Sequence, residues 1–402
     1  MTSPELNLER LVAKENFCFY CRRLVSPSFG ELSQEVVSHL KPMGGDFQKE
    51  CGLCKGLFLE VPWFVELILK AVEPYQYETF LVGVVLDPEI KEKEEKIFKE
   101  VKEKTGKQPS TSLEKLLKTE IGKKIQEKTG KIVDFHRPDI MAILDTRYDD
   151  VRLQISSIYI YGRYRKLVRG IPQTVWHCRK CRGKGCRYCH FSGKMYETSV
   201  QELIAEPVLK VSGGIKTSFH GMGREDIDAL MLGNGRPFVL EIKEPKKRVL
   251  DYEKLEKEVN KAHPGLVEIL GLRSSSHEEV VKIKSSNYPK RYRVKVKCAQ
   301  KVEEAKLKKA FQTLTGAVIE QRTPLRVKHR RADKVRKRKV LEIEGRILDD
   351  HTLEIEVKGE SGLYIKELVH GDGGRTKPSL SELLENECEV ETLDVIWIYD
   401  QE

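Results

Sequence analysis

The sequence has no long hydrophobic run and no N-terminal signal peptide. A helix that crosses a membrane needs about 20 consecutive apolar residues, so the composition argues against a membrane protein. A secretory signal requires an apolar segment near the N-terminus, so secretion is also unexpected. We therefore predict a soluble, cytoplasmic protein with no membrane partner and no evident obligatory protein partner.

A glycine-rich nucleotide loop in a strand–loop–helix setting is also missing. Methyltransferases and thiolases that modify RNA bind a cofactor or nucleotide, and they would require such a loop. Its absence argues against these classes of enzyme.

Acidic residues are outnumbered, with 62 Asp+Glu against 72 Lys+Arg, which gives a formal net charge of +10. This balance favours an anionic partner, and nucleic acid is the commonest one. The length of 402 residues is enough for two or three domains, each with its own core.

Ten cysteines are present, and eight of them form four Cys-x2-Cys pairs. In an intracellular protein such pairs favour zinc over disulfides, although a redox pair or buried free cysteines are alternatives. Four sulfur ligands leave no open position on zinc, so each site would be structural. The predicted ligands of the two sites are Cys18, Cys21, Cys51 and Cys54, and Cys178, Cys181, Cys186 and Cys189.

The chain after the first cysteine pairs predicts alternating helices and strands. Residues 61–85 indicate a helix and then a strand, and two lysine-rich helices follow, ending at Gly106 and Gly130. The lysines either contact RNA or form a solvated face. Strands are predicted between residues 132 and 160, the last of them from 151 to 160. A tail of interleaved Tyr and Arg, 161–170, suits base stacking and phosphate contact.

A glycine-flanked turn, Gly223-Arg-Glu-Asp-Ile-Asp228, carries an arginine and carboxylates. A carboxylate becomes a usable nucleophile or base when a fixed cation keeps it ionised, and Arg224 lies two residues before Asp226. The alternative is that Asp226 and Asp228 only cap a helix or brace a turn. A Gly-Asn-Gly turn at 233–235 and a strand at 238–242 are predicted to follow.

A dense basic run occupies residues 326–339, with nine Lys/Arg and one acidic residue. This density predicts contact with phosphates. Residues 280–285 and 292–298 are predicted strands, and 340–357 a hairpin.

Taken together, Arg224-Glu225-Asp226 and Gly362-Leu363-Tyr364-Ile365-Lys366 resemble the motifs of pseudouridine synthases, the second as part of a strand. The helices and strands between residues 61 and 172 resemble a THUMP domain. The chain is similar, nearly end to end, to archaeal and eukaryotic tRNA pseudouridine synthases that act on the TΨC arm. The internal cysteine knuckle indicates the archaeal branch.

The resemblance implies an α+β protein. Residues 1–60 would be a zinc-binding segment, 61–172 a THUMP-like α/β RNA-binding domain and 173–197 a zinc knuckle. Residues 198–402 would form a pseudouridine synthase fold on a largely antiparallel mixed sheet.

The resemblance further implies an isomerase that converts uridine to pseudouridine in the T loop of tRNA, at positions 54 and 55, without a catalytic cofactor. Asp226 would be the nucleophile. The substrate-binding residues would be Arg224, Tyr292, Tyr364, Lys366 and Leu383. Many relatives have arginine in place of Lys366. Leu380 and Leu384 are alternatives to Leu383, and both tyrosines could be ordinary core residues. A non-catalytic zinc-containing tRNA- or rRNA-binding factor, or another THUMP-bearing RNA-modifying enzyme, is the alternative function.

Overall fold

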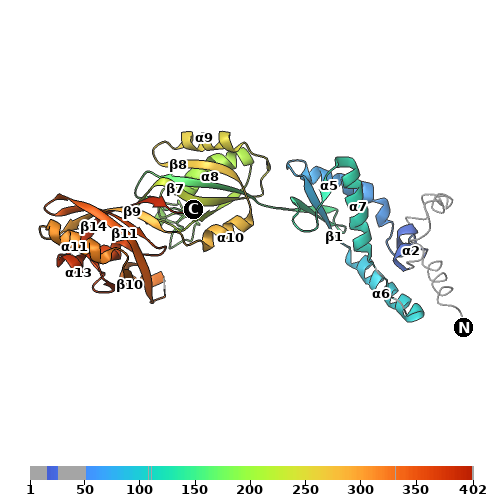
Figure 1. Ribbon diagram of the computed structural model, residues 1–402. Helices are drawn as coiled ribbons and strands as arrows, with labels where there is room; N and C mark the ends of the chain where they lie inside the picture. The colour runs from blue at the N-terminus through green and yellow to red at the C-terminus, as the bar shows by residue number, and fades with distance from the viewer. Residues whose placement is uncertain (1–15, 26–50, 107, 110, 331, 401–402) are drawn as a thin grey trace. The chain divides into compact units, whose positions relative to one another are not determined.

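The computed structural model describes residues 16–25, 51–106, 108–109, 111–330 and 332–400 (Figure 1). It divides into two compact units, and each is described separately. The first runs to Ser157 and includes residues 243–249; the second contains residues 158–242 and the chain from Leu250 onward. Within the described part of the chain, no helix combines the length and apolar character that crossing a bilayer requires.

The first unit is a four-stranded sheet in the order β2-β1-β3-β4, packed against helices. β1 runs parallel to β2 and β3, whereas β3 and β4 are antiparallel. The elements are α2 (Phe19–Val25), η2 (Leu57–Leu59), α5 (Val61–Val72), β1 (Thr79–Val85), α6 (Pro88–Thr105), α7 (Leu113–Thr129), β2 (Ile132–Val133), β3 (Ile140–Asp145) and β4 (Asp150–Ile155).

Helix boundaries in this unit follow the predicted signals. Gly106 and Gly130 end α6 and α7 in the left-handed conformation, where each backbone N–H bonds back to the last turn. Ser112 begins α7, because its side chain accepts a hydrogen bond from the N–H of Lys115. The predicted helix and strand in residues 61–85 are also confirmed, as α5 and β1.

The predicted strand at 151–160 is two strands in different units. β4 ends at Ile155, and β5 (Ile158–Lys166) lies between β7 and β8 in the sheet of the second unit. Residues 158–166 therefore do not belong to the THUMP-like region in which the sequence placed them. The physical reason is packing: Ile160 and Tyr164 of β5 are buried in the core of the second unit.

The second unit is built on a ten-stranded sheet in the order β13-β10-β11-β12-β9-β14-β7-β5-β8, with β6 paired to β7. The β14–β7 pair is parallel, whereas the other pairs with a determined register along this path are antiparallel. The predicted largely antiparallel mixed sheet is thus confirmed. Its strands are β5, β6 (Lys216–Gly221), β7 (Leu230–Lys243), β8 (Val267–Ser275), β9 (Lys290–Cys298), β10 (Val318–Arg322), β11 (Val335–Asp349), β12 (Thr352–Gly359), β13 (Thr376–Lys377) and β14 (Cys388–Ile398).

Two hydrophobic cores lie along this sheet. One joins β5, β7 and β8 to the helices α8 (Val200–Ser212), α9 (Tyr252–Ala262) and α10 (His277–Ser285). The other core is formed by β9, β10, β11 and β12 together with α11 (Glu304–Leu314), α12 (Ile365–His370) and α13 (Leu380–Leu384). In Figure 1 the labels of α8, α9 and α10 lie at one end of the unit, and those of α11 and α13 lie at the other. Tyr292 on β9 packs against both cores, so it marks the middle of the sheet.

Three local predictions were wrong. Residues 280–285 lie in helix α10, because Val280 and Ile283 are spaced to bury one helical face. The segment 233–235 is an irregularity inside β7 rather than a turn; a Cβ on Gly233 would lie 1.7 Å from the carbonyl oxygen of Ile396. Residues 362–366 are a turn that leads into α12 rather than a strand.

Candidate active site and metal centres

Asp226 lies on the loop between β6 and β7, and a buried lysine is hydrogen-bonded to the backbone of this loop. Lys166, on β5, is fully buried, and its Nζ donates hydrogen bonds of 3.1 Å to the carbonyl oxygens of Asp226, Ile227 and Ile171. Burial lowers the pKa of this lysine, although the Glu225 carboxylate opposes the shift. These three hydrogen bonds fix the backbone of the loop at Asp226.

Glu225, the neighbour of Asp226, points into the protein. Its Oε2 accepts hydrogen bonds from Tyr164 Oη at 2.7 Å and from Arg236 Nε at 2.9 Å, and its Oε1 lies 3.9 Å from Lys166 Nζ. Burial acts to lower the pKa of Arg236, but the Glu225 carboxylate together with Tyr164 and Tyr292 outweighs it, and the pKa is raised. This buried network anchors the loop, and the Asp226 side chain remains one-third exposed.

Two cations from distant parts of the chain reach Asp226. Arg326 Nη1 lies 3.2 Å and Lys366 Nζ 3.6 Å from Asp226 Oδ2. Lys366 is also 2.8 Å from Asp228. The guanidinium of Arg224, which the sequence placed as the cation for Asp226, lies over the ring of Trp176 at 5.5 Å. Lys366 near Asp226 agrees with the sequence interpretation.

Arg326 was missed as an active-site residue, although it is the first residue of the basic run. It lies in the 3-10 helix η4 (Leu325–Arg330), and its Nε donates to Oε1 of the buried Glu367 at 2.8 Å. Burial acts to lower the pKa of Arg326, but the hydrogen bond that it donates to Glu367 and the nearby charges of Glu367 and Asp226 raise it overall. The guanidinium is therefore charged and held between two carboxylates.

A cavity of about 480 Å³ opens at Asp226. It is lined by five of the six predicted site residues: Arg224, Asp226, Tyr292, Tyr364 and Lys366. Leu383 is not among the lining residues, because it packs against the core beneath α13. The apolar side chains of the lining are instead Ala229, Val327, Leu363, Ile365, Leu393 and Val395.

The environment of the two cavity tyrosines sets the pKa of Tyr292 and fixes the backbone of Tyr364. Burial raises the pKa of Tyr292 to about 12, so its hydroxyl stays protonated at neutral pH. The backbone of Tyr364 is fixed by Gln321, whose buried amide accepts from the Tyr364 N–H and donates to its carbonyl oxygen, both at 2.8 Å. Lys290, two residues before Tyr292 on β9, also lines the cavity, and burial lowers its pKa to about 8.

Within the basic run of residues 326–339, the part that lies on β11 directs alternate side chains towards the cavity and away from it. On β11, Arg336 and Arg338 line the cavity. Lys337 lies between them and forms an ion pair with Glu320 outside the cavity. Successive side chains of a strand point to opposite faces, so about half of this part of the run faces the site.

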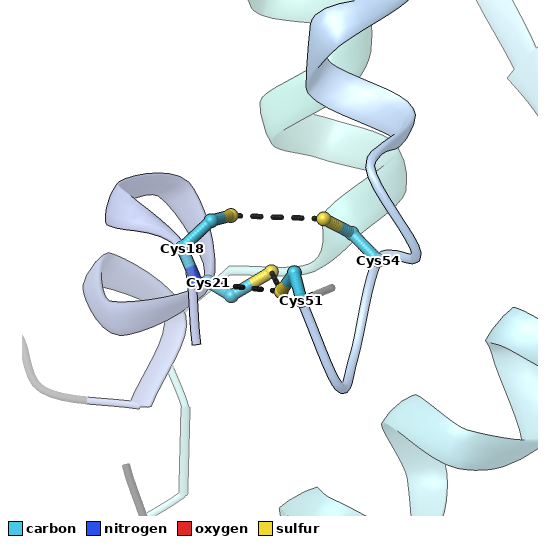
Figure 2. Close-up of side chains that lie close together, drawn as sticks. All are labelled: Cys18, Cys21, Cys51 and Cys54. Carbon is cyan, nitrogen blue, oxygen red and sulfur yellow. Dashed lines mark hydrogen bonds between the residues drawn. The ribbon is translucent and has the colours of Figure 1, made fainter. Parts of the chain in front are cut away.

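Each predicted cysteine cluster converges on one point. The sulfurs of Cys18 and Cys54, and of Cys21 and Cys51, are 3.6 Å apart, and Figure 2 shows all four directed inward. In the second cluster the closest sulfur pairs are 3.7 to 3.9 Å apart. Tetrahedral coordination with Zn–S bonds of about 2.3 Å requires sulfurs about 3.8 Å apart. Both sets therefore fit one metal ion each, and all eight predicted ligands are involved.

Comparisons with known proteins identify the family of the chain. Residues 159–399 match the family model described as "Pus10, C-terminal", and residues 64–145 match "Pus10 THUMP domain, archaeal". The chain belongs to the Pus10 family. This membership confirms the predicted family, the THUMP-bearing α+β fold and the isomerase class.

Several curated Pus10 relatives match most of the chain, and each is named "tRNA pseudouridine synthase Pus10". The protein of Methanocaldococcus jannaschii is 42% identical over 92% of this chain and 80% of its own length. That of Archaeoglobus fulgidus is 41% identical over 88% and 96%. That of Methanothermobacter marburgensis is 47% identical over 80% and 78%. The C-terminal Pus10 match begins inside β5, where the second unit of the structure also begins.

Proposed function

We propose that this protein is a tRNA pseudouridine synthase that isomerises uridine in the T loop, with Asp226 as its nucleophile. The observation that carries the proposal is the position of Asp226: its carboxylate faces a cavity that also contains Tyr292 and Tyr364. Arg326 and Lys366 lie 3.2 and 3.6 Å from its Oδ2 and orient the carboxylate towards the cavity. The names of the Pus10 relatives support tRNA as the substrate.

The reaction needs no oxidant, reductant or energy source, because uridine and pseudouridine have the same composition. The bond between uracil N1 and ribose C1′ breaks, and a bond forms between C5 and C1′. C5 loses a proton and N1 gains one. We therefore propose catalysis without a catalytic cofactor.

The residues of the cavity have separate roles in this proposal. The target nucleotide is extruded from the T loop, and the rings of Tyr292 and Tyr364 offset part of the cost by stacking on the uracil. Leu363, Leu393 and Val395 supply the apolar surface beneath the base, in place of Leu383. Arg336 and Arg338 contact phosphates beside the extruded nucleotide. Burial keeps the Tyr292 hydroxyl protonated, so in this proposal it relays the proton that C5 loses: its oxygen accepts that proton while its own proton passes to water, and N1 takes up a proton from water.

The remaining modules serve RNA capture. We propose that the THUMP domain binds tRNA and that each cysteine cluster holds a structural zinc ion. Four thiolates at these spacings suit zinc and leave no position open for chemistry. When bound, the ion supplies a rigid cross-link between the segments that carry the cysteines.

The test uses a tRNA transcript labelled with tritium at C5 of uridine. The wild-type chain should release tritium in the absence of any added cofactor, and Asp226→Ala should release none while it retains tRNA with nearly unchanged affinity. Tritium release by the variant at the wild-type rate would exclude the assignment. A wild-type chain that binds tRNA but never releases tritium would identify a binding factor.

The role of Asp226 as nucleophile has a test of its own. If Asp226 instead removed a proton from ribose C2′, deuterium at C2′ would slow turnover several-fold, because that C–D bond would break. Attack on C1′ leaves this bond intact, so we expect nearly equal rates for the two substrates.

A further inference from the structure

Residues 174–196, here called the knuckle, carry a positive charge that the protein does not neutralise. The knuckle contains six Lys/Arg and neither Asp nor Glu. Lys194 pairs with Glu202 at the base. In the described part of the chain, no carboxylate lies within ion-pairing distance of the other five, which are Arg179, Lys180, Arg182, Lys184 and Arg187. Elsewhere many exposed cations are paired, as Arg273 on β8 is with Glu279.

Two aromatic side chains stand among these cations. Phe191 is 72% exposed and Tyr188 52% exposed, and the ammonium of Lys180 lies 4.4 Å from the centre of the Tyr188 ring. Phe191 has a φ of 61°, a left-handed conformation that bulky residues rarely adopt. The backbone thus holds a large apolar ring in solvent, where burial gives it no stabilisation.

The knuckle is connected to the active site by hydrogen bonds. Its stem is a short antiparallel pairing: the N–H of Cys178 donates to Gly193, and the N–H of Met195 donates to Trp176. Immediately before the stem, Gln173 Nε2 donates to the carbonyl oxygen of Gly223 at 2.9 Å, at the start of the Asp226 loop.

The stem also contacts the loop through an aromatic ring. Trp176 packs edge-on against Tyr196, with ring centres 5.6 Å apart, and carries the guanidinium of Arg224 over its face. Arg224 lines the cavity. A ligand that leaves the cavity over Arg224 and Trp176 therefore meets the knuckle next.

We propose that the knuckle is a second RNA contact of the catalytic unit. Its cations bind the sugar–phosphate backbone, and Tyr188 and Phe191 stack on an unpaired base, while the target nucleotide occupies the cavity. This inference rests on the proposed function for the identity of the RNA. Five unpaired cations around two exposed rings match the chemistry of single-stranded or looped RNA, which offers both phosphates and free base faces.

The role of the knuckle cations is tested with two variants of the full chain, each carrying four substitutions. The knuckle variant is Arg179→Gln, Arg182→Gln, Lys184→Gln and Arg187→Gln, which leaves every cysteine in place. The control changes four exposed lysines elsewhere in the same unit and has the same net charge: Lys216→Gln, Lys254→Gln, Lys261→Gln and Lys309→Gln.

The dissociation constant for tRNA is measured at several salt concentrations between about 0.05 and 0.3 M, a range wide enough to determine the slope of log Kd against log salt. The slope of log Kd against log salt should fall by about 2 or more in the knuckle variant, and Kd at about 0.1 M salt should rise roughly 20-fold. The kcat at saturating tRNA should stay near the wild-type value. Equal Kd and slope in the two variants would overturn the proposal.

Aromatic substitution and cross-linking test the stacking. Tyr188→Ala and Phe191→Ala should each raise Kd about fivefold or more, without altering the salt slope. A photoreactive residue at position 188 in the otherwise wild-type chain should cross-link to the tRNA, which keeps the proposal testable if the charge variant misfolds. Cross-linking to a protein alone would overturn it. If wild type binds tRNA but forms no pseudouridine, the proposed function fails, while the binding experiments still test the knuckle.

Discussion

The carboxylate of Asp226 lies 3.2 Å from the guanidinium of Arg326, although the two residues are 100 positions apart in the chain. The same guanidinium donates to Glu367, which is buried beside Lys366 at the start of α12. Glu367 does not line the cavity, so the cation at Asp226 is oriented by a carboxylate outside it. A positioned cation can direct a carboxylate and stabilise charge without moving during the reaction.

The first prediction concerns the anchor of Arg326. Glu367→Gln removes the charge that orients the guanidinium, and Arg326→Gln removes the cation itself. Both should lower kcat roughly tenfold or more, equivalent to about 1.4 kcal/mol in the barrier, with little change in Kd for tRNA. Single-turnover tritium release measures the rate. Glu354→Gln, at an exposed ion pair with Arg346, is the control and should retain wild-type kcat.

The second prediction concerns the buried network under the loop. Glu225→Gln leaves Arg236 and Lys166 without their counter-charge, and breaking a buried pair costs about 3–5 kcal/mol. Urea unfolding should show this loss in the free energy of unfolding. Glu344→Gln removes an exposed partner of Arg291 and should cost no more than about 1 kcal/mol. Similar losses for the two variants would contradict the prediction.

The third prediction is a pH dependence of stability. Lys290 has a pKa of about 8 in the folded protein, below the value of 10.5 for an ordinary lysine. Between these values the unfolded chain binds more protons than the folded chain, so stability attributable to Lys290 rises with pH. The penalty for burying its charge is present in full below pH 8 and is relieved towards pH 10.5.

Lys290→Met measures this penalty. The free energy of unfolding of wild type minus that of the variant should increase by up to about 3 kcal/mol between pH 7 and pH 10.5. Other titrating groups cancel in the difference. A difference that stays constant over this range would show that Lys290 does not titrate there.

The fourth prediction separates two leucines. Leu393 lines the cavity, whereas Leu383 packs against the core. Leu393→Ala should lower kcat/KM roughly tenfold or more, because an apolar contact in a binding pocket contributes about 1–3 kcal/mol. Leu383→Ala should lose stability without a comparable loss of activity at a temperature where both variants are folded. A larger activity loss from Leu383→Ala would restore the original interpretation of the sequence.

The fifth prediction concerns the metal sites. Purified wild type should contain two zinc ions per chain by elemental analysis, and Cys51→Ser and Cys181→Ser should each contain one. Because metal binding is coupled to folding, Cys51→Ser should lower the thermal stability of the first unit. Cys181→Ser should weaken tRNA binding through the knuckle. Loss of both ions from either variant would show that the sites are not independent.

Much of this protein was determined by the sequence alone, because the signals concerned are local. Each Cys-x2-Cys spacing places two sulfurs on one side of a short turn, and Gly106 and Gly130 end their helices through backbone conformation. The turn around Asp226 and the Gly-Leu-Tyr-Ile-Lys motif were recognisable for the same reason.

Only the tertiary structure decided which residues meet at Asp226. Arg326 and Glu367 come from segments with no sequence signal connecting them. They meet because α12 packs against β14 and β13, and β13 pairs with β10, the strand that precedes η4. Leu393 rather than Leu383 lines the cavity because β14 runs through the middle of the sheet, next to β7 and β9. A side chain's neighbours across a sheet depend on strand order and register, and those are set by the burial of whole faces rather than by any short stretch of sequence.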